Sequence, residues 1–334
     1  RTMVYWILDA VGVSTVSSGC IRLHSSRPAT AIAARITIQS NKFRCNRNLT
    51  FFCSMFVTND VALIIFIPFT LMLLDQLDCK RCIIPVLVFQ TIAANLGSMA
   101  TPVGNPQNLY LYAFFDLGIA DFFAVTLPLT AVSLIGLAAS SLPLLPRALP
   151  EQERQEQGIT SLKQLLIYLV LFALCLLTVF RVIHFATTAI IVTAVLLIVQ
   201  RKLLEEIDYM LLLTFVCFFT VSENLGRVEE IRIFLQRLLQ SSTLLTAVGT
   251  SQVISNVPSA VLLSHFTTDY QSLLPAVNIG GLGTIIASLA SLITISEYRL
   301  HDPKGLKKYF VKFTALNVGF LIILYIVQSV ALTL

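Results

Sequence analysis

Residues 238–264 read LLQSSTLLTAVGTSQVISNVPSAVLLS, an apolar run without one charged residue. As one straight helix the run would extend about 40 Å, whereas the hydrocarbon core of a bilayer is roughly 30 Å thick. Polar side chains gather at its centre, at Ser251, Gln252, Ser255 and Asn256, where contact with lipid would leave them unpaired. The stretch therefore predicts a re-entrant hairpin, in which two half-helices meet at Ser255–Asn256 and open to the same side of the membrane.

The composition of the whole chain places that hairpin in a membrane protein. Of the 334 residues, 56% are hydrophobic and 12% are charged, and the mean hydropathy is +0.82. An ordinary soluble domain has about 25% charged residues. Further uncharged runs occur at 122–145, 164–180, 182–200, 270–296 and 313–334. They predict an all-α, polytopic membrane protein, because a lipid-exposed sheet edge would leave backbone groups unpaired.

The net charge of +5 indicates orientation in the membrane. If the loop at Lys80–Arg81 is cytoplasmic, twelve of the basic residues from there onward lie inside and four lie outside. This bias agrees with the positive-inside rule. The location of the basic residues in cytoplasmic loops explains the excess of Lys and Arg over Asp and Glu, and we expect no nucleic-acid partner.

A second polar interruption follows the first. The stretch PAVNIGGLGTIIASLAS, residues 275–291, places Asn278, Gly280 and Thr284 in the middle of an apolar run, where they predict a broken helix. Broken helices are tolerated in membranes where they are buried in protein or line a cavity, and they often form binding sites in secondary transporters.

The N-terminal half carries the same pair of elements. SMFVTNDVALIIFIP (54–68) matches SQVISNVPSAVLLSH (251–265), and AANLGSMATPVG (93–104) matches AVNIGGLGTIIA (276–287). In the second match Asn95 stands opposite Asn278, Gly97 opposite Gly280, and Thr101 opposite Thr284. The predicted fold therefore has two repeats, each with a re-entrant hairpin and a broken helix, and the assumed topology makes them inverted repeats.

These elements divide the chain into five predicted parts. They are an atypical N-terminal segment (1–47), a first transport unit (48–145), a cytoplasmic linker (146–163), scaffold helices (164–240) and a second transport unit (241–334). The first unit is expected to hold a hairpin at about 48–75, a broken helix at about 82–116 and a span at 119–145; the second unit holds their counterparts at about 241–266, 271–296 and 309–334. Residues 1–47 are basic, Ser-rich and poor in acidic residues, a composition that taken alone is typical of a transit peptide. We expect instead a truncated or divergent part of the scaffold.

Four motifs together resemble the ion transporter superfamily, and most closely its citrate-transporter-like permeases and divalent anion:sodium symporters. They are TNDVALIIFIPF (58–69), ANLGSMATPVGNPQN (94–108), SQVISNVPSAVLL (251–263) and NIGGLGT (278–284). Arsenite permeases and sodium/proton antiporters are related to the same group. The resemblance covers about residues 48–334. It implies a secondary active transporter of an anion, expected to be a di- or tricarboxylate, coupled to Na⁺ or H⁺.

The resemblance also assigns site residues. The substrate-binding residues are expected to be Thr58, Asn59, Gly104, Asn105, Pro106, Ser255, Asn256 and Thr284. The ion-binding residues are expected to be Asn59, Asp60, Gly97, Asn256, Asn278 and Gly280. The expected partners are a small anionic substrate, the lipid bilayer of the cell (inner) membrane and a second copy of the chain in a homodimer. We expect no cofactor beyond Na⁺ as coupling ion.

Asp60 departs from the family pattern. The third residue of each hairpin tip is usually Thr, but it is Asp60 in one half and Val257 in the other. A charge in mid-membrane costs roughly 2.5–3.5 kcal/mol, so a bound cation or proton could decide the state of the carboxylate. Asp60 is predicted to hold the coupling ion; a helix-capping role and exposure to water are the alternatives. Two other functions stay open: a sodium/proton antiporter that uses Asp60, and a truncated transporter that is inactive alone.

The sequence offers no candidate for enzyme chemistry. It has no P-loop, GxGxxG or nucleophile-elbow motif, and its four histidines are dispersed. Cys79 and Cys82 form a CxxC pair without a second pair to complete a metal site. We interpret these two cysteines as small apolar residues at a membrane boundary.

Overall fold

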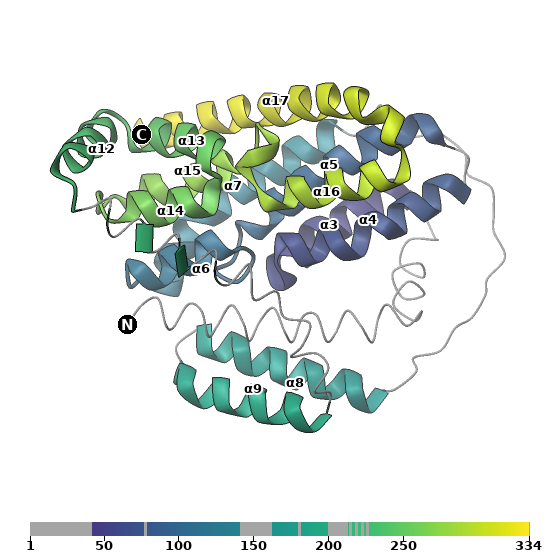
Figure 1. The fold of residues 1–334 in the computed structure, drawn as a ribbon, viewed down its shortest axis with the longest axis horizontal. Helices are drawn as coiled ribbons and strands as arrows, with labels where there is room; N and C mark the ends of the chain where they lie inside the picture. The colour runs from purple at the N-terminus through teal and green to yellow at the C-terminus, as the bar shows by residue number, and fades with distance from the viewer. Residues whose placement is uncertain are drawn as a thin grey trace. The chain divides into compact units, whose positions relative to one another are not determined.

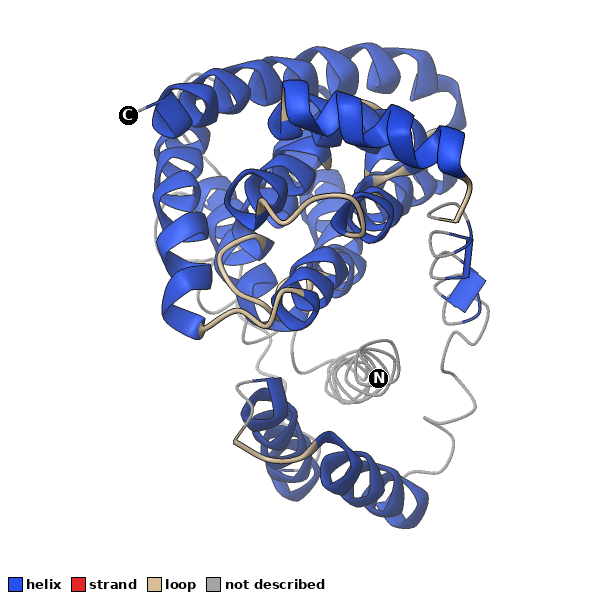
Figure 2. Ribbon diagram, turned by 90° about the vertical axis from the view of Figure 1, so that its left-hand side faces the viewer, coloured by secondary structure: helices blue, strands red, loops and turns tan. Residues whose placement is uncertain are grey.

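The protein is all-α wherever its structure is described. The computed structural model describes residues 42–76, 79–140, 162–179, 182–199 and 227–333, with a few positions between 213 and 224. Within these ranges every regular element is a helix (Figure 1), and loops join the helices (Figure 2). The chain divides into two compact units, residues 47–145 with 213–334, and residues 1–46 with 146–212. The predicted class, an all-α membrane protein, is confirmed.

The first half of the larger unit contains five helices. They are α3 (Lys42–Val57), α4 (Asn59–Gln76), α5 (Lys80–Ser98), α6 (Pro106–Phe114) and α7 (Ile119–Ser140). Thr58 alone separates α3 from α4, and residues 99–105 separate α5 from α6. Helix α3 begins six residues before the predicted hairpin. Its first turns carry Lys42, Arg44 and Arg47, which belong to the basic segment 1–47 that was predicted to lie outside the first transport unit.

The second half follows the same order. Its elements are α12 (Glu229–Ser241), α13 (Thr243–Ile254), α14 (Asn256–Ser264), α15 (Tyr270–Gly280), the 3₁₀ turn η2 (Ile285–Ala287), α16 (Leu289–His301), the 3₁₀ turn η3 (Pro303–Gly305) and α17 (Leu306–Thr333). Ser255 alone separates α13 from α14, and residues 281–288 separate α15 from α16. Each half thus holds a pair of helices joined at one residue, a helix with an interrupted centre, and a long helix.

Local capping fixes where several of these helices begin. The side chain of Asn105 accepts a hydrogen bond from the Asn108 N–H, and Pro106 occupies the first turn of α6, where no intrahelical N–H is needed. Ser242 accepts from the Leu245 N–H at the start of α13, and Asp269 accepts from the Ser272 N–H at the start of α15. Each cap satisfies an N–H that the helix itself leaves free.

Helix α5 runs through the interior of this unit. It packs against α4, α7, α16 and α17, while α13 packs against α14 and α15. Among the described residues, three segments are long and apolar enough to cross a membrane: Lys80–Ser98, Ile119–Ser140 and Pro303–Thr333. In the first, 78% of the most apolar 18-residue window is buried inside the protein, against 33% and 22% in the others. Of these three segments, those that contain α7 and α17 therefore present more apolar surface to lipid.

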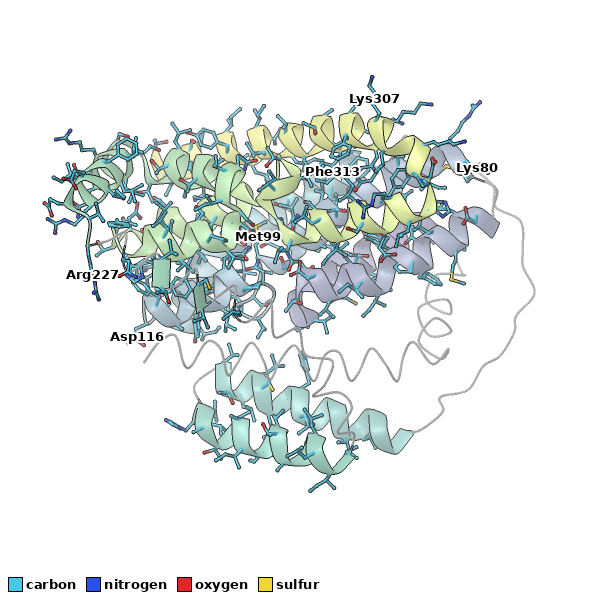
Figure 3. All side chains as sticks on the ribbon, in the orientation of Figure 1. Lys80, Met99, Asp116, Arg227, Lys307 and Phe313 are labelled. Atoms are coloured by element: carbon cyan, nitrogen blue, oxygen red, sulfur yellow. A yellow bond between two sulfur atoms is a disulfide. The ribbon has the colours of Figure 1, made fainter. Side chains whose placement is uncertain are left out.

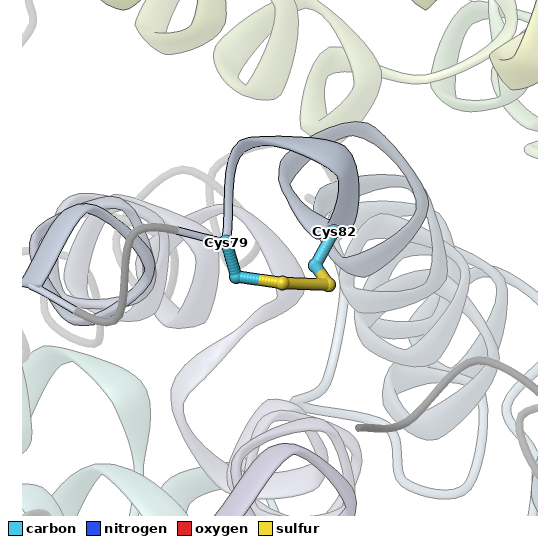
Figure 4. Close-up of a disulfide and its surroundings, with 2 residues drawn as sticks. All are labelled: Cys79 and Cys82. Atoms are coloured by element: carbon cyan, nitrogen blue, oxygen red, sulfur yellow. A yellow bond between two sulfur atoms is a disulfide. The ribbon is translucent and has the colours of Figure 1, made fainter. Parts of the chain in front are cut away.

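Cys79 and Cys82 form a disulfide at the start of α5 (Figure 4). The interpretation of these residues as separate small apolar side chains was therefore wrong. The two cysteines lie three positions apart, and the helical turn that begins at Cys79 brings their side chains to the same side.

The smaller unit contains two described helices, α8 (Leu162–Val179) and α9 (Phe185–Val199). They pack against each other, and the hydroxyls of Thr178 and Thr188 lie 2.6 Å apart. Helix α9 lies within the range predicted as scaffold, 164–240, and α8 begins two residues before it. The predicted linker, 146–163, lies outside the described residues except for its last two positions, and so does the N-terminal segment before residue 42.

A hydroxyl pair joins the two halves of the larger unit, and it gives a first testable prediction. Thr91 on α5 and Thr294 on α16 are both buried, and their side-chain oxygens lie 2.7 Å apart. Replacing either Thr with Val should destabilise the protein by about 1 kcal/mol, since the remaining hydroxyl loses one hydrogen bond but keeps its bond to the carbonyl four residues before it, at Leu87 or Ala290. In a double-mutant cycle, measured by titrating the protein with denaturing detergent in mixed micelles, the double variant should lose less than the sum of the singles. Strictly additive losses would show that the pair contributes no coupling.

Candidate functional site

Both hairpin tips have a backbone conformation that is uncommon for residues other than glycine. Thr58 has φ 59° and Ser255 has φ 74°, and each stands between two helices. A left-handed conformation at such a residue costs free energy and persists only where surrounding contacts enforce it. The tips are therefore places where the fold holds strain, as binding sites often do.

The first tip is held by a chain of buried amides. Asn59 Nδ2 donates to Asn95 Oδ1 at 3.0 Å, and Ser288 Oγ donates to the same oxygen at 3.0 Å. The Asp60 N–H donates to Asn59 Oδ1 at 3.0 Å, and the Asn59 N–H donates to the Gly104 carbonyl at 3.0 Å. These bonds connect the hairpin tip, both interruptions and helix α5, although the residues are far apart in sequence.

A second group of amides surrounds Asn278. Its Oδ1 accepts from Asn105 Nδ2 at 3.0 Å, and its Nδ2 donates to Asn108 Oδ1 at 2.6 Å. Asn108 Nδ2 in turn lies 3.1–3.4 Å from the carbonyls of Ser98, Met99 and Thr101, so it fixes the loop before α6. We call Asn59, Asp60, Asn95, Asn105, Asn278 and Ser288 the central cluster. Its five amide and hydroxyl residues are each at most 4% exposed.

The contacts of the two halves correspond one to one at three places. Asn105 lies ten residues after Asn95 and bonds to Asn278, whereas Ser288 lies ten residues after Asn278 and bonds to Asn95. Each residue also precedes the second helix of its pair, α6 or α16. Each interruption is thus bound to the broken helix of the opposite half.

The other two correspondences lie between hairpin and broken helix. Thr101 Oγ1 donates to the Met55 carbonyl, and Thr284 Oγ1 donates to the Gln252 carbonyl. A Cβ built on Gly97 would lie 2.6 Å from Ser54 Oγ, and one built on Gly280 would lie 2.6 Å from Ser251 Oγ. Met55 and Gln252 stand three residues before their tips, and Ser54 and Ser251 stand four before them.

Four helices begin at or beside the central cluster: α4 at Asn59, α14 at Asn256, α6 after Asn105 and α16 after Ser288. Free N–H groups and the positive end of the helix dipole favour anions at such positions. The cluster also lies at mid-length of the unit. Figure 3 shows Met99, in the first interruption, between the end that carries Lys80 and Lys307 and the end that carries Asp116 and Arg227.

Two buried polar atoms of the cluster have no hydrogen-bond partner among the described residues. They are Asp60 Oδ1, an acceptor, and Asn95 Nδ2, a donor. An unpaired buried polar group costs about 1–3 kcal/mol, and more if it is charged. In the first half of the site, Asp60 Oδ1 can therefore still bind a donor or a cation, and Asn95 Nδ2 can still donate to an acceptor such as an anion.

The predicted residues divide into those inside the cluster and those around it. Asn59, Asp60, Asn105 and Asn278 belong to it, Gly104 accepts the bond from Asn59, and Asn256 is 3% exposed at the second tip. Thr58, Pro106 and Ser255 are half-buried, and Thr284 is exposed with its hydroxyl turned to the Gln252 carbonyl. Gly97 and Gly280 face the first arms of their hairpins, where a side chain would collide with Ser54 or Ser251.

Sequence reasoning missed four residues that the structure brings into the site. They are Asn95, Gln252, Asn108 and Ser288. Asn95 had been aligned with Asn278 but was not assigned a role. Ser288 could have been found by extending that alignment ten residues to Asn105.

Comparisons with known proteins agree with this geometry. The family model described as "Citrate transporter" matches residues 48–272. The chain is 35% identical over 248 residues to the uncharacterised transporter MJ0456 of Methanocaldococcus jannaschii, a match that covers 74% of this chain and 68% of that protein. It is 33% identical over 249 residues to the inner membrane protein YbiR of Escherichia coli, covering 72% of this chain and 65% of that protein.

A shorter match reaches the low-affinity phosphate transporter PHO90 of Saccharomyces cerevisiae, at 33% identity over 84 residues, or 24% of this chain and 10% of that protein. The chain spans about two thirds of the length of the first two relatives. The buried polar interruptions, the apolar spans and the match over residues 48–272 lead to one conclusion. The chain is a multi-pass integral membrane transport protein that belongs to the citrate transporter family.

Proposed function

We propose that the chain is a secondary active transporter that binds a small anion together with a cation at the central cluster. The observation that carries this proposal is a pair of buried, unpaired atoms in the first half of the site: Asn95 Nδ2, on α5, requires an acceptor, and Asp60 Oδ1, at the hairpin tip, requires a donor or a cation. An anion and a cation bound side by side would satisfy both. No catalytic residue is needed for this function.

The anion would be bound by neutral donors. The cluster offers amide N–H groups and four helix N-termini, which can surround carboxylate oxygens without the strong charge of an Arg pair. We infer a di- or tricarboxylate as the first substrate class to test. Inorganic phosphate is the second, since PHO90 is named as a phosphate transporter.

The cation would be bound at Asp60 and would be carried with the substrate. The carboxylate oxygen, together with carbonyls at the ends of α3 and α5, provides the oxygen ligands that Na⁺ prefers. A proton on the same oxygen would also remove its charge. We therefore propose Na⁺ or H⁺ as the coupling ion.

Inverted repeats would supply the movement that transport requires. The three corresponding contacts support a two-fold relation between the halves, because they join equivalent residues of each hairpin and broken helix. In alternating access, such a pair moves against a scaffold and exposes the same site to each side in turn. The cell membrane is the proposed location, in line with the name of YbiR.

A sodium/proton antiporter is the second candidate, and Asp60 is the observation that favours it. The charged side chain in the cluster is an acid with a buried free oxygen, which is the group that an antiporter needs to exchange cations. In that case Asn95 would not bind an anion.

Ligand binding by the purified chain separates these functions. The thermal midpoint should rise with citrate or succinate in the presence of Na⁺ or at low pH, and proteoliposomes should accumulate the labelled anion when the ion gradient is imposed. Phosphate is measured in parallel. If Na⁺ alone stabilises the protein and dissipates a pH gradient, while none of the three anions has any effect, the antiporter replaces the symporter.

A further inference from the structure

The two halves of the site differ at the residue that stands three positions before each hairpin tip. Met55 and Gln252 occupy this position, and both accept a threonine hydroxyl on the main-chain carbonyl. Only Gln252 adds a side chain with donors and an acceptor. Its side-chain contacts with residues 280–284, at the end of α15 and the start of the neighbouring interruption, have no counterpart at Met55 among the described residues.

Three carbonyl oxygens converge on the side-chain nitrogen of Gln252. Nε2 lies 2.8 Å from the Gly280 oxygen, 3.0 Å from the Leu282 oxygen and 3.3 Å from the Val248 oxygen. The other end of the amide, Oε1, accepts from the Thr284 N–H at 2.9 Å. Carbonyls at the C-terminal end of a broken helix carry partial negative charge, and such groups often bind a monovalent cation in transporters. Here the side-chain N–H groups of Gln252 occupy the point at which the three carbonyl oxygens converge.

The acid shows the opposite asymmetry. Asp60 is the second residue of α4 in the first half, and the equivalent residue of α14 is Val257, which has no charge. The half that contains Asp60 thus has Met55 in place of the amide, and the half that contains Gln252 lacks the acid. Both differences, Asp60 against Val257 and Met55 against Gln252, therefore favour cation binding in the first half and not in the second.

We propose that the Gln252 amide takes the place of a cation in the second half of the site, so that cation binding is confined to the first half. This inference rests on the proposed function, because it assigns the coupling ion to Asp60. It also removes the predicted ion-binding role of Gly280, whose carbonyl is engaged by Gln252. In the second half, Gln252 is a positioning residue that keeps the interruption folded when no cation is present.

Hydrogen exchange of the peptides that cover residues 280–288 tests this inference. The purified chain is compared in Na⁺ and in choline at equal ionic strength. In the wild type, exchange in this loop should be slow and the same in both salts. Gln252→Met copies the first half and should speed exchange about tenfold in both salts, because the bonds to Gly280, Leu282 and Thr284 are lost.

Gln252→Glu provides the sharpest comparison. Glutamate keeps the acceptor for Thr284 but places a carboxylate oxygen next to the carbonyl oxygens, which repel it unless a cation binds between them. The loop should therefore exchange fast in choline and about tenfold slower in Na⁺. Gln271→Glu makes the same chemical change at an exposed position of α15 and should have no effect. Any of three results would overturn the inference. They are wild-type exchange that is slower in Na⁺ than in choline, exchange in Gln252→Met that equals the wild type, and exchange in Gln252→Glu that is the same in both salts. The wild-type measurement decides even if neither variant folds.

Failure of this inference is distinguishable from failure of the proposed function. The coupling ion is detected by Na⁺-dependent thermal stabilisation, which depends on Asp60. A wild type that citrate, succinate and phosphate all fail to stabilise, both in Na⁺ and at low pH, would contradict the proposed function, whereas a loop that stays protected in choline would still support the role of Gln252.

Discussion

Gly97→Ala should prevent the larger unit from folding stably. A Cβ at this position would overlap the Phe51 carbonyl oxygen and would lie 2.6 Å from Ser54 Oγ. A backbone carbonyl cannot rotate away, so α3 and α5 would have to separate, and the first tip and its amide bonds would shift with them. Overpacking of a core usually costs about 1–3 kcal/mol, and we expect a loss at or above the upper end. The measurement is the yield and thermal midpoint of the monodisperse protein in detergent.

Two other glycines provide matched controls for this variant. A Cβ on Gly280 would lie 2.6 Å from Ser251 Oγ, which can rotate, and 2.7 Å from Ser251 Cβ, which the backbone of α13 holds in place. Gly280→Ala should therefore also destabilise the protein, but less than Gly97→Ala, whose Cβ would overlap a backbone carbonyl group. Gly249 lies on the exposed side of α13 with nothing within 4 Å, so Gly249→Ala should be neutral or stabilising by up to about 1 kcal/mol. Equal behaviour of all three variants would refute the packing argument.

Asp60→Asn is the variant with the largest expected effect on ion coupling. Asparagine preserves the shape of the side chain but removes the negative charge that the unpaired Oδ1 contributes. A hydrogen bond or ion contact to a charged group contributes about 1.5–3 kcal/mol, so the apparent affinity for Na⁺ should fall roughly 100-fold. The variant should be at least as stable as the wild type without Na⁺, since it no longer buries a charge.

The contrast between binding and stability distinguishes this role from a capping role. If Asp60 only capped α4, Asp60→Asn would leave the Na⁺ dependence of the thermal midpoint unchanged, because Asn is as good a cap as Asp. Asp116→Asn is the control: Asp116 has φ 54°, which Asn tolerates, and it lies at the end of the unit, away from the cluster (Figure 3). It should leave the response of the thermal midpoint to Na⁺ unchanged.

Local patterns in the sequence predicted several elements because their causes are local. Uncharged runs predicted membrane helices, and the hydroxyl-Asn pairs at Thr58–Asn59 and Ser255–Asn256 predicted points at which one helix ends and another begins. Gly97 and Gly104 predicted the position of the interruption after Asn95, and the glycines of NIGGLGT (278–284) predicted that of the interruption after Asn278. Boundaries at charged residues were less accurate, since α3 extends back to Lys42. A long side chain can leave the membrane edge while its backbone stays helical.

The partners of the central cluster could not be predicted in the same way. Ser288 and Asn95 lie 193 residues apart, and Asn105 and Asn278 lie 173 apart, so no local rule connects them. The unpaired state of Asp60 Oδ1 is also a property of the whole arrangement, because it depends on which groups all the neighbouring helices bring close. The CxxC pair was read as two separate residues for a related reason: side-chain direction depends on the turn in which the chain starts α5.

By itself, the sequence determined the membrane environment, the helical class, the repeated hairpin and broken-helix motifs, and the position of an acid at one tip. Hydropathy, backbone hydrogen bonding and the conformational freedom of glycine act over a few residues, so their effects can be predicted from the sequence. Only the tertiary structure decided that Asn95 and Asp60 keep free polar atoms while Gln252 fills the equivalent place in the other half. Such differences arise because hydrogen bonds are satisfied in three dimensions, and two similar motifs can meet different partners after they pack.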